Sequence, residues 1–419
     1  MKKRDFLKTL STAAAGLPLM GFAPEWANLP ASNAPDMASN EDFWDKVRKD
    51  YILKPEYINL ESGYYNIIPH PTLKAVQAKM DIVNREGSYY MRTVQWENKD
   101  RAADALGKLL GSSGKNVILT RNTTESLDLV IQGFPWKAGD EALFAIQDYG
   151  AMQDMFGMVA KRFDLKLNKV SVPNHPKDDE EIVKLYEDAL TPNTKLLMIC
   201  HMINITGHIL PVRKICDMAH RHGVQVMVDG AHCVAHFEFD IMDLNCDYYG
   251  SSLHKWLAAP LGTGMLYVKD EHIDNIWPLL AESPREAGDI HKLNHTGTHP
   301  VYHDLGVEVA IEYHQMIGGK RKEERLRFLQ RYWSDKVRDV ENIVLNTPKD
   351  PERSCGIANV GIKGMKPATM AKRLMDEHKI WTVAIDYANV QGCRITPNVF
   401  TTTKELDAFV VALKDLARA

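Results

Sequence analysis

The 419-residue sequence has little excess charge, because 51 lysine and arginine residues stand against 55 aspartate and glutamate residues, a net charge of −4. A chain this close to neutrality, with its basic residues scattered, lacks the positive field that nucleic-acid binding needs. It also lacks any run of eighteen apolar residues, so we expect no membrane anchor in the mature protein. Its six cysteines show no CxxC spacing, which argues against a zinc ribbon or a disulfide framework.

The first 27 residues have the pattern of an export signal. Lys2, Lys3 and Arg4 precede a mildly apolar stretch and alanine positions suited to cleavage. The segment KRDFLK resembles the twin-arginine export pattern, with Lys3 in place of the first arginine. We therefore predict an export signal over residues 1–27 and a periplasmic protein, with an ordinary secretory signal or a frayed tail as the alternatives. Residues 28–55 are predicted to be a linker and an N-terminal arm.

Between residues 115 and 270, short apolar runs alternate with amphipathic segments. The strand-like runs are NVILT, EALFAI, KLNKV, KLLMIC, VQVMV and GMLYV. This alternation predicts an α/β fold with a mostly parallel sheet sandwiched by helices, in a large domain over residues 56–300. One long helix or two, short strands and a last helix then predict a smaller α+β domain over residues 301–419. Ligands bind beyond the carboxyl ends of parallel strands, so the residues that follow the runs are the candidates for a site.

Two residues in this part of the chain carry opposite charges. Asp229 follows VQVMV, and Lys255 lies among small, apolar and aromatic residues in GSSLHKWL. A buried carboxylate needs a cationic partner, so a simple ion pair is one interpretation. The other is that Asp229 holds a heterocyclic nitrogen protonated while Lys255 offers an amine to a carbonyl group. Pyridoxal 5'-phosphate (PLP) needs both contacts, and burial that depresses the pKa of the lysine makes its amine nucleophilic.

The segment ILTRNTTESL joins a strand directly to the start of a helix. Asn122 can cap this helix together with the glutamate three residues later. Thr123 and Thr124 then place hydroxyl and free amide groups at the positive end of the helix, where a phosphate is favoured. Ser252 and His254 can reach the same phosphate from the segment around the lysine. A simple helix cap without a ligand is the alternative.

Five motifs, in their order along residues 57–400, resemble those of the class V aminotransferase family of PLP-dependent enzymes. They are LTRNTTESL, HMINITGHILP, VDGAH, SSLHKWL and CRI. The resemblance implies a fold-type I PLP-dependent transferase that acts on a small amino-acid-type substrate. It also implies a homodimer with its active site at the subunit interface. VDGAH and GSSLHKW are most similar to the motifs of isopenicillin N epimerase-like members.

The resemblance also implies a role for each matching residue. Lys255 resembles the lysine that carries the cofactor, and Asp229 the partner of the ring nitrogen. Asn204 and His232 are implied at the phenolic oxygen of the cofactor, His232 also as a catalytic residue, and Tyr149 at the ring face. The other implied contacts are Thr123, Thr124, Ser252 and His254 at the phosphate, with Thr298 from a neighbouring subunit, Arg394 at the α-carboxylate of the substrate, and Gly63 near the substrate.

The resemblance further implies a reaction through a carbanion at Cα, which leads to epimerisation or transamination. Desulfuration is disfavoured, because the segment EHKIWTVAIDYANVQG before Arg394 lacks the cysteine that would carry a persulfide. A protein that binds PLP without turnover is the remaining alternative. HCVAH places His232 and His236 four residues apart, but no third ligand suggests itself, so we predict no metal site. His201 is either a pocket residue or a buried core histidine.

Overall fold

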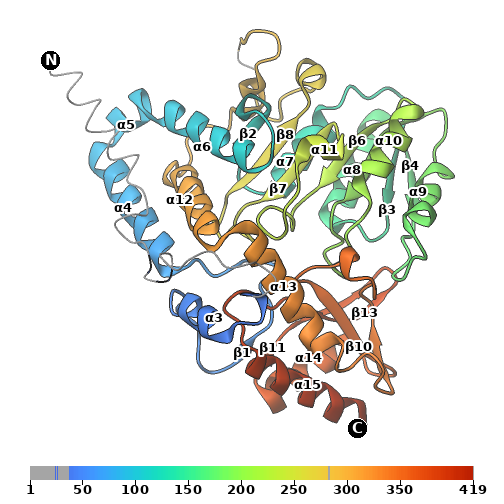
Figure 1. Cartoon of the computed structure of the whole chain (residues 1–419). Helices are drawn as coiled ribbons and strands as arrows, with labels where there is room; N and C mark the ends of the chain where they lie inside the picture. The colour runs from blue at the N-terminus through green and yellow to red at the C-terminus, as the bar shows by residue number, and fades with distance from the viewer. Residues whose placement is uncertain (1–23, 25, 27–36, 282–283, 419) are drawn as a thin grey trace.

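A computed structural model describes residues 24, 26, 37–281 and 284–418, and its centre is a seven-stranded sheet (Figure 1). The strand order is β2-β8-β7-β6-β5-β3-β4. Strands β4, β3, β5, β6 and β7 pair in parallel, whereas β8 runs antiparallel to both β7 and β2. The strands are β2 (Val117–Thr120), β3 (Glu141–Ala145), β4 (Lys166–Val170), β5 (Thr194–Cys200), β6 (Gln225–Asp229), β7 (Tyr248–Ser252) and β8 (Gly264–Val268).

Helices cover both faces of this sheet, because successive side chains of a strand point to opposite faces. Leu143 of β3, for example, packs into the apolar core on one face and Phe144 into the core on the other. The first face is covered by α6 (Gln95–Leu109), α9 (Asp179–Glu187) and α10 (Val212–Arg221), and the second by α7 (Thr123–Gly133) and α8 (Gly150–Phe163). The predicted fold class, an α/β fold with a mostly parallel sheet between helices, is confirmed.

The C-terminal third forms a second, smaller layer below the large sheet in Figure 1. Its four-stranded antiparallel sheet has the order β12-β13-β10-β9. The strands are β9 (Ile343–Leu345), β10 (Ala358–Ile362), β12 (Val383–Tyr387) and β13 (Val390–Ile395), and the helices are α13 (Gly319–Ser334), α14 (Pro367–His378) and α15 (Thr403–Arg418). An apolar core that includes residues of β10, β13, α13, α14 and α15 holds this unit together.

The N-terminal arm belongs structurally to the small unit, although it is distant in sequence. Helix α3 (Glu41–Arg48) is tied to α15 by the Arg48–Glu405 ion pair and to α13 by the Arg325–Glu41 ion pair. Strand β1 (Ile58–Asn59) pairs in parallel with β11 (Ile380–Trp381). The polypeptide that leads from β1 toward the large sheet therefore starts from a fixed position beside the small unit.

The structure adds one strand to those expected, and of the two alternatives for the long C-terminal helical pattern, one helix or two, it has two. Residues 248–252 were not among the expected strands but form β7, whose Tyr-Tyr-Gly-Ser-Ser sequence lacks the aliphatic run that marks the other strands. The long C-terminal helical pattern divides into α12 (Tyr302–Ile317) and α13 at Gly318, whose φ of 89° ends a helix. The predicted export signal lies outside the described residues, except for positions 24 and 26. Residues 28–36 of the predicted linker also lie outside them. Among the described residues, no helix has the length and hydropathy needed to cross a bilayer.

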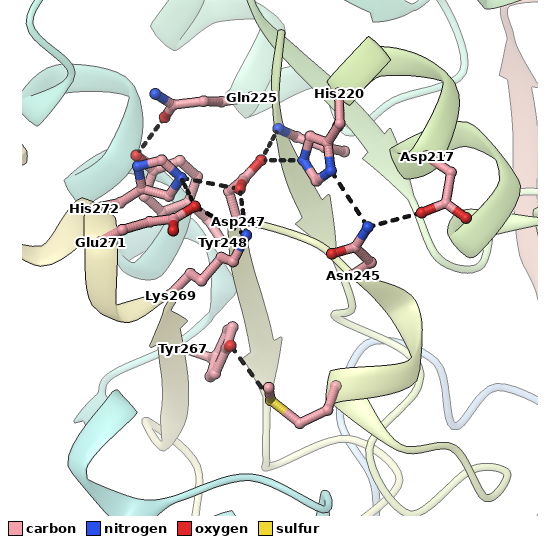
Figure 2. A network of polar contacts seen from close by, with 12 residues as sticks. Asp217, His220, Gln225, Asn245, Asp247, Tyr248, Tyr267, Lys269, Glu271 and His272 are labelled. Carbon is pink, nitrogen blue, oxygen red and sulfur yellow. Dashed lines mark hydrogen bonds and ion pairs between the residues drawn. The ribbon is translucent and has the colours of Figure 1, made fainter. Parts of the chain in front are cut away.

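Asp247 centres a polar network at the edge of the sheet opposite the strand carboxyl ends (Figure 2). Its Oδ2 accepts hydrogen bonds from the Val226 backbone N–H at 2.7 Å and lies 2.8 Å from His220 Nε2. Its Oδ1 lies 3.0 Å from His272 Nε2, and Lys269 adds a positive charge at 4.0 Å. These hydrogen bonds hold the pKa of the Asp247 carboxyl well below its usual range, against the opposing effect of burial. The network ties β6, β7 and α10 together.

We expect Asp247→Asn to lower the free energy of unfolding by about 3 kcal/mol. Three N–H groups now donate to the two carboxylate oxygens of Asp247, whereas the side chain of asparagine has one oxygen that can accept, and its NH₂ group would face N–H donors. The carboxylate stabilises the fold above its unfolded-state pKa, and this contribution is lost as the pH falls through the lower folded-state pKa. Urea unfolding at pH 7 should therefore show the full difference, and the difference should shrink below about pH 4.

The matched control is Asp81→Asn on the exposed side of α4 (His70–Glu86). It should change the unfolding free energy by less than about 0.5 kcal/mol. Equal stability of the Asp247 and Asp81 variants at pH 7 would contradict the role given to the network.

Candidate active site

A cavity of about 330 Å³ opens at the carboxyl ends of β5, β6 and β7, next to the start of α7. Parallel α/β sheets bind ligands at this edge. Residues from the large unit, the opening loop after β1 and strand β13 of the small unit line it together. The lining includes Gly63, Tyr64, Asn122, Thr123, Thr124, Tyr149, Cys200, Met202, Asn204, Asp229, His232, Ser252, His254, Lys255, Leu261, Gly262 and Arg394.

The start of α7 offers an anion site on one side of the cavity. Asn122 caps the helix, its side chain accepting a hydrogen bond from the Glu125 N–H at 2.9 Å. Thr123 lies against Ser252 of β7, with 2.7 Å between the two hydroxyl oxygens. Gly264 permits this closeness, because a Cβ there would lie 2.6 Å from the Asn122 Cα. The Thr123 N–H is not free as expected, because it donates to Ser252 Oγ at 3.0 Å, but the threonine and serine hydroxyl groups still meet at a helix end where negative charge is favoured.

His254 faces the same part of the cavity in a defined orientation. Its Nδ1 lies 3.0 Å from the Thr263 carbonyl oxygen, which can only accept, so Nδ1 carries the proton. Burial, assisted by the Lys255 charge, lowers the pKa of His254 to about 4. The ring is therefore neutral at physiological pH and presents Nε2 as its second polar atom.

Lys255 follows β7 directly and projects its amine into the cavity. Burial is the largest influence on the pKa of Lys255, which it lowers to about 8, and Arg394 acts in the same direction. Asp229 and Glu61 oppose this shift without cancelling it. The amine is therefore neutral in about a tenth of the molecules at pH 7 and in about half of them at pH 8, and the neutral form is the one that adds to a carbonyl group.

His232 contacts the lysine, with 3.1 Å between His232 Nε2 and Lys255 Nζ. The indole N–H of Trp256 donates to His232 Nδ1 at 3.3 Å. Because the indole can only donate, Nδ1 must accept, and the proton of the neutral imidazole lies on Nε2. Burial and the neighbouring Lys255 charge hold the pKa of His232 well below its usual value. With its proton on Nε2, His232 can donate only to the lone pair of the uncharged form of the Lys255 amine, and this tautomer therefore favours that form.

This arrangement predicts the titration of Lys255 in the cofactor-free protein. Labelling by an aldehyde with borohydride, followed by peptide analysis, should give a midpoint near pH 8 for Lys255. In Trp256→Phe the His232 proton is free to move to Nδ1, so Nε2 can accept from the charged ammonium group, and the midpoint should move to higher pH. Trp333→Phe, at a buried tryptophan of the small unit, is the control and should leave the midpoint in place.

Asp229, at the end of β6, brings a second charge to the cavity. It is 6% exposed, and its Oδ1 accepts from the Ala231 N–H at 2.9 Å. Burial raises the pKa of Asp229, while this hydrogen bond and the Lys255 charge lower it. Asp148, behind it, is also buried, and desolvation together with the Asp229 charge raises the pKa of Asp148 to about 7. Of the two carboxyl groups, Asp229 is the one that lines the cavity.

Arg394 reaches the cavity from β13, but it does not present a free guanidinium group. Glu61 pairs with it along one edge, with Arg394 Nη2 2.6 Å from Oε1 and Nε 3.2 Å from Oε2. Arg394 Nη1 lies 3.4 Å from the Asn204 carbonyl oxygen. Sequence reasoning missed Glu61. The sequence did hold a sign of it. Glu61 stands two residues before Gly63 in the opening loop, so a Gly63 close to Arg394 brings the Glu61 carboxylate close to that arginine as well.

The other candidate residues divide into those that the cavity gathers and those that it does not. Asn204 and Tyr149 line the cavity, Tyr149 with 47% of its surface exposed at the rim. Thr298 is exposed and lies outside the cavity of its own chain. His201 is a core histidine, since its Nδ1 lies 3.0 Å from the Tyr249 hydroxyl and burial lowers the pKa of His201 to about 3.

All six cysteines are buried free thiols. Cys393, next to Arg394 in the chain, directs its sulfur toward the Pro367 carbonyl oxygen at 3.8 Å. Cys200 lines the cavity, but burial raises the pKa of its thiol well above the usual value, and the thiol donates to Asp148. None of these six sulfurs combines exposure with a mobile loop near the arginine.

Comparisons with known proteins agree with this geometry. The chain is 26% identical over 398 residues to the isopenicillin N epimerase of Streptomyces clavuligerus, covering 89% of this chain and 98% of that protein. It is 27% identical over 300 residues to a probable cysteine desulfurase of Halalkalibacterium halodurans, covering 68% and 72% of the two chains. The structure of an apo cysteine desulfurase from Thermococcus onnurineus NA1 superposes with a TM-score of 0.78 at 20% identity, over 93% of this chain and all of that one, which shows a shared fold.

The family comparison extends over most of the chain. Residues 69–386 match aminotransferase class-V. The prediction that this is an enzyme and the prediction of its cofactor are thereby confirmed at the level of the family. The chain belongs to the aminotransferase class-V family of PLP-dependent enzymes.

Proposed function

We propose that this protein is a PLP-dependent enzyme that moves the Cα proton of an amino-acid-type substrate, leading to epimerisation or transamination as in isopenicillin N epimerase-like proteins. The observation that carries the proposal is the shared cavity of Lys255, Asp229 and the start of α7. The near full-length similarity to an isopenicillin N epimerase supports the epimerase-like branch. Because probable cysteine desulfurases are about as similar, the similarity supports the cofactor more strongly than the substrate.

The residues of the cavity fit PLP in kind and in place. The helix start, with Thr123, Thr124, Ser252 and neutral His254, suits a phosphate. Asp229 suits a protonated ring nitrogen, and the buried amine of Lys255 suits an aldehyde. When bound, PLP supplies an electron sink for the carbanion at Cα. The remaining proposed contacts are Asn204 and His232 at the phenolic oxygen and Tyr149 at the ring face.

Lys255 is proposed as the base that takes the Cα proton and returns it. Its lowered pKa places the amine close to the operating pH, where a general base is most effective. His232 would hold this amine through Nε2 and, being neutral, would not compete for the proton. Arg394 and Gly63 line the same cavity as Lys255 and are proposed to contact the substrate.

The test is deuterium incorporation at Cα across a panel of L- and D-amino acids and aminoacyl peptides in deuterated water. Exchange with racemised product and no keto acid supports epimerisation, and exchange with keto acid supports transamination. Release of sulfide from cysteine, without exchange into other substrates, would instead support the desulfurase alternative. A cofactor-loaded protein that exchanges no proton with any member of the panel would favour the binding protein without turnover.

We also propose export through a twin-arginine type signal, as the N-terminal pattern predicts. One structural observation bears on its processing. Trp26 is buried, packs edge-on against Phe43 and Tyr313, and donates from Nε1 to Asp50 at 2.8 Å. A mature chain that keeps this contact begins at or before Trp26, not after residue 27. N-terminal sequencing of the periplasmic protein tests both points, since cytosolic protein alone would remove the export proposal.

A homodimer is proposed as the functional unit, with Thr298 reaching the phosphate of the neighbouring subunit. The exposure of Thr298 outside its own cavity is compatible with that role. Thr298→Val should weaken cofactor binding without changing the fold. A monomeric mass in solution for the cofactor-loaded protein would exclude this contact.

A further inference from the structure

The Arg394–Glu61 pair occupies the guanidinium group that the resemblance assigns to a substrate carboxylate. Both side chains are nearly fully buried, at 7% and 4% exposure. The edge formed by Nε and Nη2 is one of the edges of a guanidinium group that can form two parallel hydrogen bonds with a carboxylate, and both nitrogens donate to Glu61. A substrate carboxylate therefore cannot use this edge while Glu61 holds it.

Glu61 is also fixed in place from its other side. Its Oε1 accepts hydrogen bonds from the Gly63 and Tyr64 backbone N–H groups, each at 2.9 Å. Its Oε2 lies 3.4 Å from the Thr396 hydroxyl. The loop packs closely on the arginine, because a Cβ on Gly63 would lie 2.9 Å from Arg394 Cζ. For Glu61 to leave the arginine, these backbone N–H groups would lose their acceptor in a buried site, which is costly.

The donors of Arg394 that remain are the second N–H of Nη2 and the Nη1 group, which lies 3.4 Å from the Asn204 carbonyl oxygen. A substrate carboxylate at the Nη1 and Nη2 end would be bound by a group whose charge Glu61 already balances, and the Glu61 carboxylate on the adjoining edge would repel it. The net charge of the pair is zero, so the attraction that a lone arginine exerts on a carboxylate is largely cancelled.

We infer that Glu61 is a specificity-determining residue, which cancels the recognition of a free α-carboxylate by Arg394. The substrate class follows: primary amines whose neighbouring carboxyl group is amidated, esterified or absent are accepted about as well as free amino acids. This inference rests on the proposed function, because it concerns which amine reaches the cofactor next to Lys255.

The test compares two small probes that capture the carbonyl group of bound PLP and differ by one carboxylate. Aminooxyacetate carries the carboxylate, and O-methylhydroxylamine lacks it. The rate constant of each is measured from the loss of cofactor absorbance, and their ratio is divided by the same ratio for free PLP. We expect a corrected ratio within about threefold of one for the wild-type holoenzyme, and a ratio about tenfold higher for Glu61→Gln, whose amide leaves Arg394 charged.

Two further variants keep the test decisive. Glu61→Asp retains the charge and should keep the wild-type ratio even if the loop is less stable. Glu61→Gln combined with Arg394→Gln should lose the gain, which assigns it to the arginine. A wild-type ratio far above one, or an unchanged or lower ratio in Glu61→Gln, overturns the inference. A wild-type protein that shows no absorbance of bound cofactor overturns the proposed function, and this inference with it.

Discussion

Lys255→Ala is expected to abolish the absorbance band of lysine-bound cofactor and to lower turnover by at least about 10³-fold. The reason is geometric as well as chemical. Lys255 is the lysine that lines the cavity, and it follows β7 at the point where the strand carboxyl ends meet. Its lowered pKa supplies both the neutral amine that adds to a carbonyl group and the base that moves the Cα proton. The absorbance spectrum and the exchange of the Cα proton measure these two losses separately.

A buried lysine outside the cavity provides the control for this experiment. Lys322 on α13 is 5% exposed, burial lowers its pKa to about 7, and it donates to the Trp256 carbonyl oxygen. It therefore shares the depressed pKa of Lys255 but lies outside the cavity lining. Lys322→Met, which replaces the amine with an apolar side chain of similar length, should keep the cofactor band. If Lys255→Ala retains the band and Lys322→Met loses it, the cofactor has been assigned to the wrong amine.

Asp229→Asn is expected to lower turnover per bound cofactor by about 10²- to 10³-fold while the protein still binds PLP. The amide keeps the shape and can still accept the Ala231 N–H, but it loses the negative charge that favours a protonated ring nitrogen. The pKa of Lys255 should also fall below its value near 8, because Asp229 now raises it. The aldehyde and borohydride titration of the cofactor-free protein reports this second effect independently of turnover.

Asp148→Asn makes the same change in the carboxyl group behind Asp229. Because the pKa of Asp148 is raised to about 7, this group is mostly uncharged at pH 6, where an amide replaces it without a change of charge. We expect turnover within about threefold of wild type at that pH, compared with the large loss in Asp229→Asn. Similar losses in both variants would mean that the site responds to any change in this region, and the specific role of Asp229 would have to be abandoned.

The large sheet and the start of α7 could be predicted because each rests on local sequence signals. Apolar runs marked most of the strands, and the Asn122 cap with its glutamate marked the helix start. Strand β7 was not predicted. Residues 248–252 are extended because they pair with β6 and β8, and not because of their own side chains. Tertiary pairing there overrides a weak local preference.

The residues that tune the site were harder to predict, because they act through contacts that are distant in sequence. Glu61 and Arg394 are separated by 333 positions, and the opening loop gave no sign of which charge it would meet. Trp256 stood next to the predicted lysine, yet its indole N–H serves His232, 24 positions earlier. These contacts depend on how the small unit and the opening loop pack against the large sheet. The spacing of motifs along the sequence does not contain that information.

The most direct test of the account is borohydride reduction of the protein loaded with PLP, followed by peptide mapping. We predict one pyridoxyl-modified peptide, with the modification on Lys255, in the wild type and in Trp256→Phe. Modification of Lys322 or of another lysine, or a protein that takes up no cofactor and yields no modified peptide, would contradict the assignment on which every proposed role in this cavity depends.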